Sequence, residues 1–256
     1  MRAIILCAGQ GKRLRPLTNS IPKCLVELAG KTILEHQVEV LKSCGFDENE
    51  ISIVGGFNCQ KLERFNIKVF TNKDYMETNM VHSLMTASEW FTDDILIAYG
   101  DIIFNQSTLE TFLESKGKNK ILVDLQWKKL WDKRMSNPLD DAETLKFDDK
   151  KNICEIGKRA KNYSEIMAQY TGLLFFSKDL AMELLSEFKG MDPKRIYDDN
   201  SFSNLYMTSF ISYLIDRNWT FKAITTNRGW VELDTIEDFK LYQEIISMGG
   251  FSKIFE

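Results

Sequence analysis

The chain has 256 residues, a formal net charge of -4, 44% hydrophobic residues and 27% charged residues. This length is sufficient for one α/β domain with a substantial core, and the mild acidic excess argues against nucleic acid as the main partner. No apolar run approaches the roughly 20 residues of a membrane-spanning helix, and the N-terminus shows no signal-peptide pattern. Five scattered cysteines without C-x-x-C spacing indicate reduced thiols, so we expect a cytoplasmic protein with no membrane partner.

The first predicted element is a buried strand over Ile4–Leu6, which leads directly into a segment rich in glycine and cations. Gly9 and Gly11 lack a Cβ atom, so their backbone N–H groups can approach an anionic ligand closely. From Lys12 to Lys31 the chain carries five basic side chains and one acid. This pattern favours a phosphate-binding loop. It matches neither the Walker A loop nor G-x-G-x-x-G, and the alternative is a surface turn with solvated cations.

The next elements alternate between helix and strand. Thr32–Glu35 has the spacing of a capping box and begins a helix predicted over 32–43. Strands are predicted over Ile51–Val54 and Ile67–Phe70. Strands separated by helices of this length indicate right-handed βαβ units and a parallel sheet with helices on both faces. Such sheets bind ligands at the carboxyl ends of their strands.

Two aspartates are candidate magnesium ligands. Asp101 is the last residue of a buried strand predicted over Ile95–Asp101, and a carboxylate at that end of a parallel strand points into the ligand crevice. Mg²⁺ binds one or two carboxylates together with substrate phosphates, so one further acid would suffice. We expect it in the segment 229–238, where the resemblance described below assigns the role to Asp234. The alternatives are that Asp101 is a turn residue and that Asp234 caps the helix that begins near Ile236.

The rest of the chain gives predictions of structure alone. Thr78 or Asn79 is a suitable N-cap for a helix that runs to about Trp90. The other predicted elements are strands over 121–125, 152–158 and 169–176, helices over 178–188, 206–215 and 236–248, and a loop over the site from 126 to 141.

Three separated motifs carry a resemblance to a known family. They are the string L-C-A-G-Q-G-K-R-L with Pro22-Lys23, the Gly-Asp pair at 100–101 and the W-x-E-L-D-T-x-E-D block at 230–238. Together they resemble the signatures of nucleotidyltransferases of the sugar-nucleotide pyrophosphorylase-like family. The resemblance implies a Rossmann-like α/β fold with a mixed, mostly parallel sheet and helices on both faces. It implies a single domain over 1–256, a small β-rich insertion around 120–176 and an acceptor-binding region at about 120–210.

The same resemblance assigns roles to residues by position. Arg13 and Lys23 would be catalytic cations, and Asp101 and Asp234 would hold Mg²⁺. The nucleotide would be bound by Leu6, Ala8, Gly9, Gly11, Lys12, Gly55, Thr78, Asn79, Ser83 and Gly100.

The segment from Thr78 to Leu84 resembles the T-N-x-x-x-S-L motif of one branch, the cytidylyltransferases that act on phosphocholine and similar molecules. This resemblance implies CTP as the nucleotide, and an amide and a hydroxyl such as Asn79 and Ser83 can pair with the polar edge of cytosine. Lys158 matches the lysine that reaches the phosphate of the acceptor, unless it is a solvated residue at a strand end. The other expected acceptor contacts are Gln169, Tyr170, Tyr197 and Trp230. Gln169 stands where many relatives carry Glu, and an amide suits a neutral or zwitterionic acceptor.

The sequence therefore predicts an enzyme, a Mg²⁺-dependent cytidylyltransferase. It would transfer CMP from CTP to the phosphate of a small phosphocholine-like or phosphoglutamine-like acceptor, release pyrophosphate and serve the decoration of a surface polysaccharide or lipid. One alternative is a sugar-1-phosphate nucleotidylyltransferase that uses dTTP, UTP or GTP. Another is an inactive nucleotide-binding regulator. The identity of the acceptor and the formation of a homo-oligomer stay open.

Overall fold

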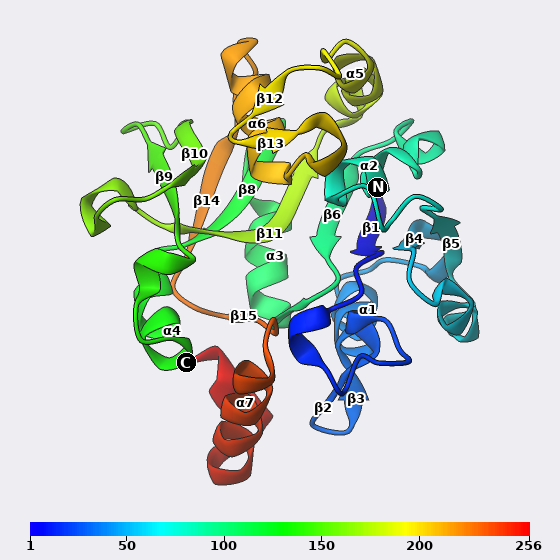
Figure 1. Ribbon diagram of the computed structural model, residues 1–256, viewed down its shortest axis with the longest axis vertical. Helices are drawn as coiled ribbons and strands as arrows, with labels where there is room; N and C mark the ends of the chain where they lie inside the picture. Colours follow the sequence, from blue (N-terminus) through cyan, green and yellow to red (C-terminus); the bar gives the residue numbers. More distant parts are fainter.

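A seven-stranded sheet forms the centre of the computed structural model, which describes residues 1–256 (Figure 1). The strand order is β14-β8-β11-β6-β1-β4-β5. Only β11 runs antiparallel to its neighbours, β6 and β8, whereas every other pair is parallel. The strands are β1 (Arg2–Cys7), β4 (Ile51–Gly55), β5 (Lys68–Thr71), β6 (Ile95–Tyr99), β8 (Asn119–Asp124), β11 (Gln169–Phe176) and β14 (Lys222–Thr226). The prediction of a mixed, mostly parallel sheet is confirmed.

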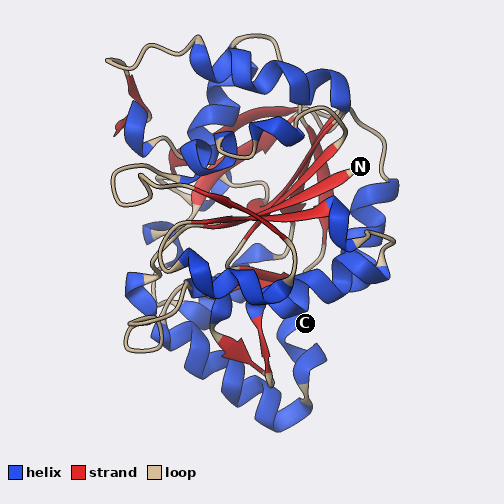
Figure 2. Cartoon of the chain, turned by 90° about the vertical axis from the view of Figure 1, so that its right-hand side faces the viewer, coloured by secondary structure: helices blue, strands red, loops and turns tan.

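Helices cover both faces of this sheet (Figure 2). Along β1, Ile5 contributes to one apolar core and Ile4 to the other, because successive side chains of a strand point to opposite faces. The first core includes residues of α1 (Ile33–Ser43), α3 (Gln106–Glu114), α4 (Trp127–Arg134) and α7 (Ile236–Gly249). The second includes residues of α2 (Met80–Met85), α5 (Lys178–Lys189) and α6 (Met207–Asp216). No helix here is both long enough and apolar enough to pass through a membrane.

Two predicted elements differ from the observed ones. The helix expected to reach Trp90 ends at Met85, and a separate 3-10 turn follows over Ser88–Trp90. The expected loop 126–141 contains α4, whose Trp127, Leu130 and Trp131 are buried. Their spacing is helical, but the charged residues between them gave the segment the composition of a loop.

The β-rich insertion is narrower than the predicted range 120–176. Only β9 (Glu143–Phe147) and β10 (Ile153–Arg159) form a separate antiparallel pair, because the strands on either side, β8 and β11, belong to the central sheet. Two other short pairs are β2 (Glu27–Leu28) with β3 (Lys31–Thr32), and β12 (Ile196–Tyr197) with β13 (Asn200–Ser201).

One short strand pair brings the two candidate magnesium ligands together. β7 (Ile102–Phe104) pairs with β15 (Trp230–Glu232), and Ile102 lies opposite Glu232. Just beyond the pair, the N–H of Leu233 donates to the carbonyl oxygen of Asp101 at 2.9 Å. The acids at 101 and 234 are distant in the sequence, and this pairing makes their backbones neighbours.

A buried glutamine of α1 supports the turn that carries Asp101. Gln37 is 0% exposed, and its Nε2 donates to the carbonyl oxygens of Tyr99, at 2.7 Å, and of Ile102. These carbonyls lie on either side of Gly100 and Asp101. Buried carbonyl groups need donors, so Gln37 fixes this turn as well as contributing to the core.

We predict that Gln37→Leu lowers the free energy of unfolding by about 1–3 kcal/mol, because two buried carbonyl groups lose their donor while the side-chain volume changes little. Urea denaturation of both proteins measures this difference. The exposed Gln243 of α7 gives the control Gln243→Leu, which should remain within about 0.5 kcal/mol of the parent. A Gln37→Leu protein as stable as the parent would contradict the supporting role.

Candidate active site

A cleft opens at the carboxyl ends of β1 and β6. Its volume is about 630 Å³ when the solvent-filled space at its mouth is included. Most of the predicted nucleotide-binding residues line it. They are Leu6, Ala8 and Gly9 from β1 and its loop, Gly100 from the end of β6, and Thr78, Asn79 and Ser83 from the start of α2. The predicted loop, helix start and strand end therefore form one cavity.

The glycines of the loop have different structural roles. A Cβ atom on Gly9 would have no neighbour within 4 Å, so this backbone faces open space in the cleft. Gly11 has φ +62°, and a Cβ atom there would lie 2.9 Å from Cβ of Lys23. Only glycine combines this backbone conformation with such a close approach. Gly11 thus lets the Lys23 side chain pass across the loop.

Gly11 and two other predicted nucleotide contacts lie outside the cleft lining. Gly55 faces the side chains of Cys59 and Leu62, and a Cβ atom on it would come within 2.7 Å of Cys59. The close packing of this segment is therefore one reason for a glycine there. Lys12 is exposed and begins a 3-10 turn directly after Gly11.

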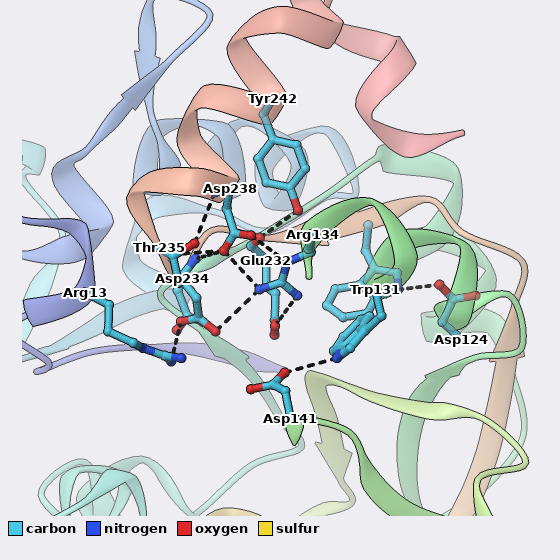
Figure 3. A network of polar contacts seen from close by, with 12 residues as sticks. Arg13, Asp124, Trp131, Arg134, Asp141, Glu232, Asp234, Thr235, Asp238 and Tyr242 are labelled. Carbon is cyan, nitrogen blue, oxygen red and sulfur yellow. Dashed lines mark hydrogen bonds and ion pairs between the residues drawn. The ribbon is translucent and has the colours of Figure 1, made fainter. Parts of the chain in front are cut away.

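Cations and acids converge at one end of the cleft. Lys23 Nζ donates to Asp101 Oδ2 at 2.7 Å and also to Asp234 Oδ1. Arg13 Nη2 lies 3.3 Å from the same Asp234 oxygen, although the Arg13 side chain is 63% exposed (Figure 3). The structure thus brings together four predicted residues from three distant parts of the chain.

The electrostatics of this group follow from burial and opposite charge. Burial alone would raise the pKa of Asp234, but Lys23 and then Arg13 hold it at about 2. Burial alone would lower the pKa of Lys23, but Asp101 and Asp234 together raise it above its ordinary value. At neutral pH Asp234 and Lys23 are therefore both charged. A carboxylate that binds a metal cation and an ammonium group that binds a phosphate must have these charges.

Asp101 and Asp234 fit a divalent metal by their position and chemistry. A single ammonium group lies within hydrogen-bond distance of both carboxylates, so their oxygens converge on one point. Two carboxylate ligands, completed by phosphate oxygens and water, form the environment that Mg²⁺ prefers. The two side chains are 27% and 14% exposed, which leaves room for such additional ligands.

A second polar network holds the other end of the cleft. Asn72, which is 4% exposed, donates from Nδ2 to Thr78 Oγ1 and to Ser83 Oγ, both at 3.0 Å. Asn79 is the N-cap of α2, because its Oδ1 accepts the N–H of Met80, while its Nδ2 donates to Asn204. The expectation that Asn79 caps this helix is confirmed. Its pairing with a base stays a prediction.

The predicted acceptor residues divide into two groups. Tyr170 stacks edge-on against Tyr99 of the cleft with ring centroids 5.6 Å apart. Gln169 is 7% exposed. Lys158 lines a second hollow together with several acids, among them Asp141 and Glu143. Lys158 therefore borders open space, whereas Gln169 is buried.

The Tyr170 hydroxyl is influenced by acids of both the second hollow and the carboxylate pair. Burial raises the pKa of the Tyr170 hydroxyl, and the nearby Glu143 and Asp101 raise it further. Burial also raises the pKa of Glu143 to about 7; a hydrogen bond with Thr208 opposes this shift, and the charges of Asp141 and Asp198 add to it. The hollow therefore carries several acids beside the cation Lys158.

Trp230 and Tyr197 are expected from the sequence to contact the acceptor, but they line neither the cleft nor the second hollow. Trp230 is 0% exposed, and its indole Nε1 donates to Asp124 Oδ2 at 3.0 Å, so the ring belongs to the core. The Tyr197 hydroxyl donates to the carbonyl oxygen of Asp192, and its ring packs against Tyr213. Large aromatic residues are favoured both in cores and in pockets, and the sequence pattern did not distinguish the two.

Sequence reasoning missed three residues that support the site: Gln37, Asn72 and Arg134. Gln37 and Asn72 are single amides within otherwise ordinary segments, and no local motif marks them. Arg134 lies at the end of α4 and contacts three acids of the segment 232–238 (Figure 3). Recognition of α4 as a helix would have drawn attention to an arginine beside two buried tryptophans.

A glycine-lined cleft at the carboxyl edge of a mostly parallel sheet, with two cations and two carboxylates at one end, is the site of a nucleotidyltransferase. The chain belongs to the MobA-like NTP transferase domain family, whose model matches residues 3–154. CTP:phosphoglutamine cytidylyltransferase of Campylobacter jejuni is 40% identical over 255 residues, which is 95% of this chain and 100% of that protein.

Two solved structures have the same fold. CTP:phosphocholine cytidylyltransferase from Streptococcus pneumoniae has a TM-score of 0.70 and 21% identity, and the match covers 96% of this chain and 98% of that one. The inositol-1-phosphate CTP transferase from T. maritima has a TM-score of 0.71 and 20% identity, and the match covers 97% of both chains. The predicted nucleotidyltransferase family and its Rossmann-like fold are thereby confirmed.

We predict that Asn72→Ala weakens nucleotide binding about 5-fold or more, because Thr78 and Ser83 each lose a hydrogen bond worth about 1 kcal/mol. Calorimetric titration with nucleoside triphosphates measures the dissociation constants. The exposed Asn49 provides the control Asn49→Ala, which should bind like the parent. Equal affinities of the Asn72→Ala protein and the parent would exclude this network from nucleotide binding.

Proposed function

We propose that this protein is a Mg²⁺-dependent cytidylyltransferase that transfers CMP from CTP to the phosphate of a small amino-acid-like acceptor such as phosphoglutamine, with release of pyrophosphate. The 40% identity to CTP:phosphoglutamine cytidylyltransferase along almost the whole chain supports this choice of nucleotide and acceptor. The product would be a CDP-activated group for the decoration of a surface polymer. Five cysteines, all free, fit a reducing cytoplasm.

The convergence of Lys23, Arg13, Asp101 and Asp234 carries the proposal. The reaction joins two anions, a nucleoside triphosphate and a phosphorylated acceptor, that repel one another. A site for it must place positive charge between them and fix their orientation. Cationic side chains and metal-binding carboxylates at the end of one cleft meet this requirement.

In the proposed reaction, an oxygen of the acceptor phosphate attacks the α-phosphorus of CTP in line with the departing pyrophosphate. The bond from the α-phosphorus to the bridging oxygen breaks as the new phosphoanhydride bond forms, and no protein nucleophile takes part. Lys23 and Arg13 stabilise the charge that builds on the phosphoryl oxygens. Gly9 and Gly11 allow the backbone to lie close to the triphosphate. Mg²⁺, when held by Asp101 and Asp234, would neutralise the reacting phosphates.

The acceptor is proposed to lie in the second hollow. Lys158 would contact the acceptor phosphate, and acids such as Glu143 would contact an ammonium group. Both signs of charge in one hollow suit a zwitterion, which carries an ammonium and a carboxylate. The amide of Gln169, at 7% exposure, is consistent with an acceptor that has no permanent net cation. Tyr170 would separate this acceptor from the nucleotide.

We predict that pyrophosphate release is fastest with CTP and phosphoglutamine. The measurement is a coupled pyrophosphate assay with CTP, UTP, dTTP and GTP, each combined with phosphoglutamine, phosphocholine and glucose 1-phosphate. A preference for dTTP, UTP or GTP with the sugar phosphate would replace the proposal with a sugar-1-phosphate nucleotidylyltransferase. Binding of CTP without turnover on any acceptor would indicate a nucleotide-binding regulator.

We also predict that Asp101→Asn and Asp234→Asn each lower kcat by about 10²–10³-fold, since each removes one charge that positions the metal and the phosphates. Steady-state assays at saturating CTP test this, and chelation of the metal with EDTA should abolish turnover of the parent until Mg²⁺ is restored. Asp149, an exposed acid of the β9–β10 turn, gives the control Asp149→Asn. Near-normal turnover of either variant would refute the metal-binding role.

A further inference from the structure

Arg134 is a buried cation that the proposed reaction does not use directly. Its side chain is only 2% exposed and lies at the end of α4, next to the segment that joins β15 to α7. Nε and Nη2 donate to the two oxygens of Asp238 at 2.9 and 3.0 Å, and Nη1 donates to Glu232 Oε1 at 2.5 Å. The paired hydrogen bonds to Asp238 form the bidentate geometry that a planar guanidinium favours.

Asp238 transmits this fixed geometry to Asp234. Its Oδ2 accepts the backbone N–H groups of Asp234 and Thr235, both at 2.9 Å, as well as the bond from Arg134. The Thr235 hydroxyl in turn accepts the N–H of Asp238, which completes the capping box of α7. Arg134 therefore anchors the same carboxylate that holds the backbone of Asp234.

Arg134 also faces the Asp234 side chain itself. Nη2 lies 3.7 Å from Asp234 Oδ2, whereas Lys23 and Arg13 contact the other oxygen, Oδ1 (Figure 3). The carboxylate thus has one cation on one side and two on the other. Positive charges at both oxygens therefore fix the orientation of the Asp234 carboxylate.

Packing restricts the movement of the Arg134 guanidinium. It lies over the Trp131 ring at 4.9 Å from the ring centroid, and the Trp131 indole donates to Asp141 Oδ2 at 3.1 Å. A lysine at this position would retain the charge but could neither stack as a plane nor donate in a fork. The structure requires the shape of arginine here as well as its charge.

We propose that Arg134 is a positioning residue for the proposed reaction: it fixes Asp234, through Asp238 and directly, in the orientation needed to hold the Mg²⁺–nucleotide complex. This inference depends on the proposed role of Asp234 as a metal ligand. Partners of metal ligands typically change metal affinity or activity by about 10–100-fold when they are altered.

The test is Arg134→Lys, compared with the parent in two measurements. In the pyrophosphate assay, the Mg²⁺ concentration for half-maximal rate should rise about 10-fold or more, with partial recovery of kcat at high Mg²⁺. In calorimetric titrations, the affinity for CTP in the presence of Mg²⁺ should fall about 10-fold, while the affinity for CTP in EDTA stays within about 2-fold. A purely structural role would lower Tm and leave both metal-dependent quantities unchanged.

The control is Arg217→Lys, since Arg217 is 53% exposed and pairs with Glu187 at 2.5 Å away from the cleft. It should match the parent in every assay. If Arg134→Lys does not fold, Asp238→Asn replaces it, because this change removes one side of the bidentate pair and should raise the Mg²⁺ requirement in the same way. A folded variant with unchanged Mg²⁺ dependence overturns the inference, whereas a parent without turnover on any substrate overturns the proposed function instead.

Discussion

The ion pairs between Lys23 and the carboxylates of Asp101 and Asp234 are the interaction on which the rest of the site depends. Charges that are largely removed from water are tolerated only when each has a partner of opposite sign in good geometry. Lys23 comes from the N-terminal loop, Asp101 from the end of β6 and Asp234 from the segment after β15. Every element that positions one of these three side chains therefore contributes to the same electrostatic balance.

Backbone pairing brings these three charged side chains together although they are far apart in the sequence. β15 pairs with β7, and α7 begins directly afterwards with Thr235 as its N-cap. From the opposite side, Gln37 of α1 holds the carbonyl groups around Asp101. The acid from the middle of the chain and the acid from its C-terminal part are thus fixed by separate elements, and small shifts in either would separate them.

The fold was largely predictable because its signals are local. Short apolar runs marked β1, β4 and β6, and the capping box at Thr32 marked the start of α1. The sheet to which β8 and β11 belong was not predictable in this way, since pairing of distant strands leaves no trace in either segment alone. α4 was missed for a different reason: beside its three buried side chains it carries the exposed charged residues Lys128, Lys129, Asp132 and Lys133.

The candidate site was predictable where a role needs a particular residue type at a fixed spacing, as in Gly9, Gly11 and Lys23. It was not predictable for Arg134 or Asn72, which act on other side chains and can occur in many positions. Arg134 adds a cation that compensates three acids, so Asp234 contacts positive charge at both of its oxygens. When phosphates and Mg²⁺ bind as proposed, Lys23 and Asp234 would exchange one partner of opposite charge for another. Neither would then be left buried and unpaired, which keeps the energetic cost of assembling the complex low.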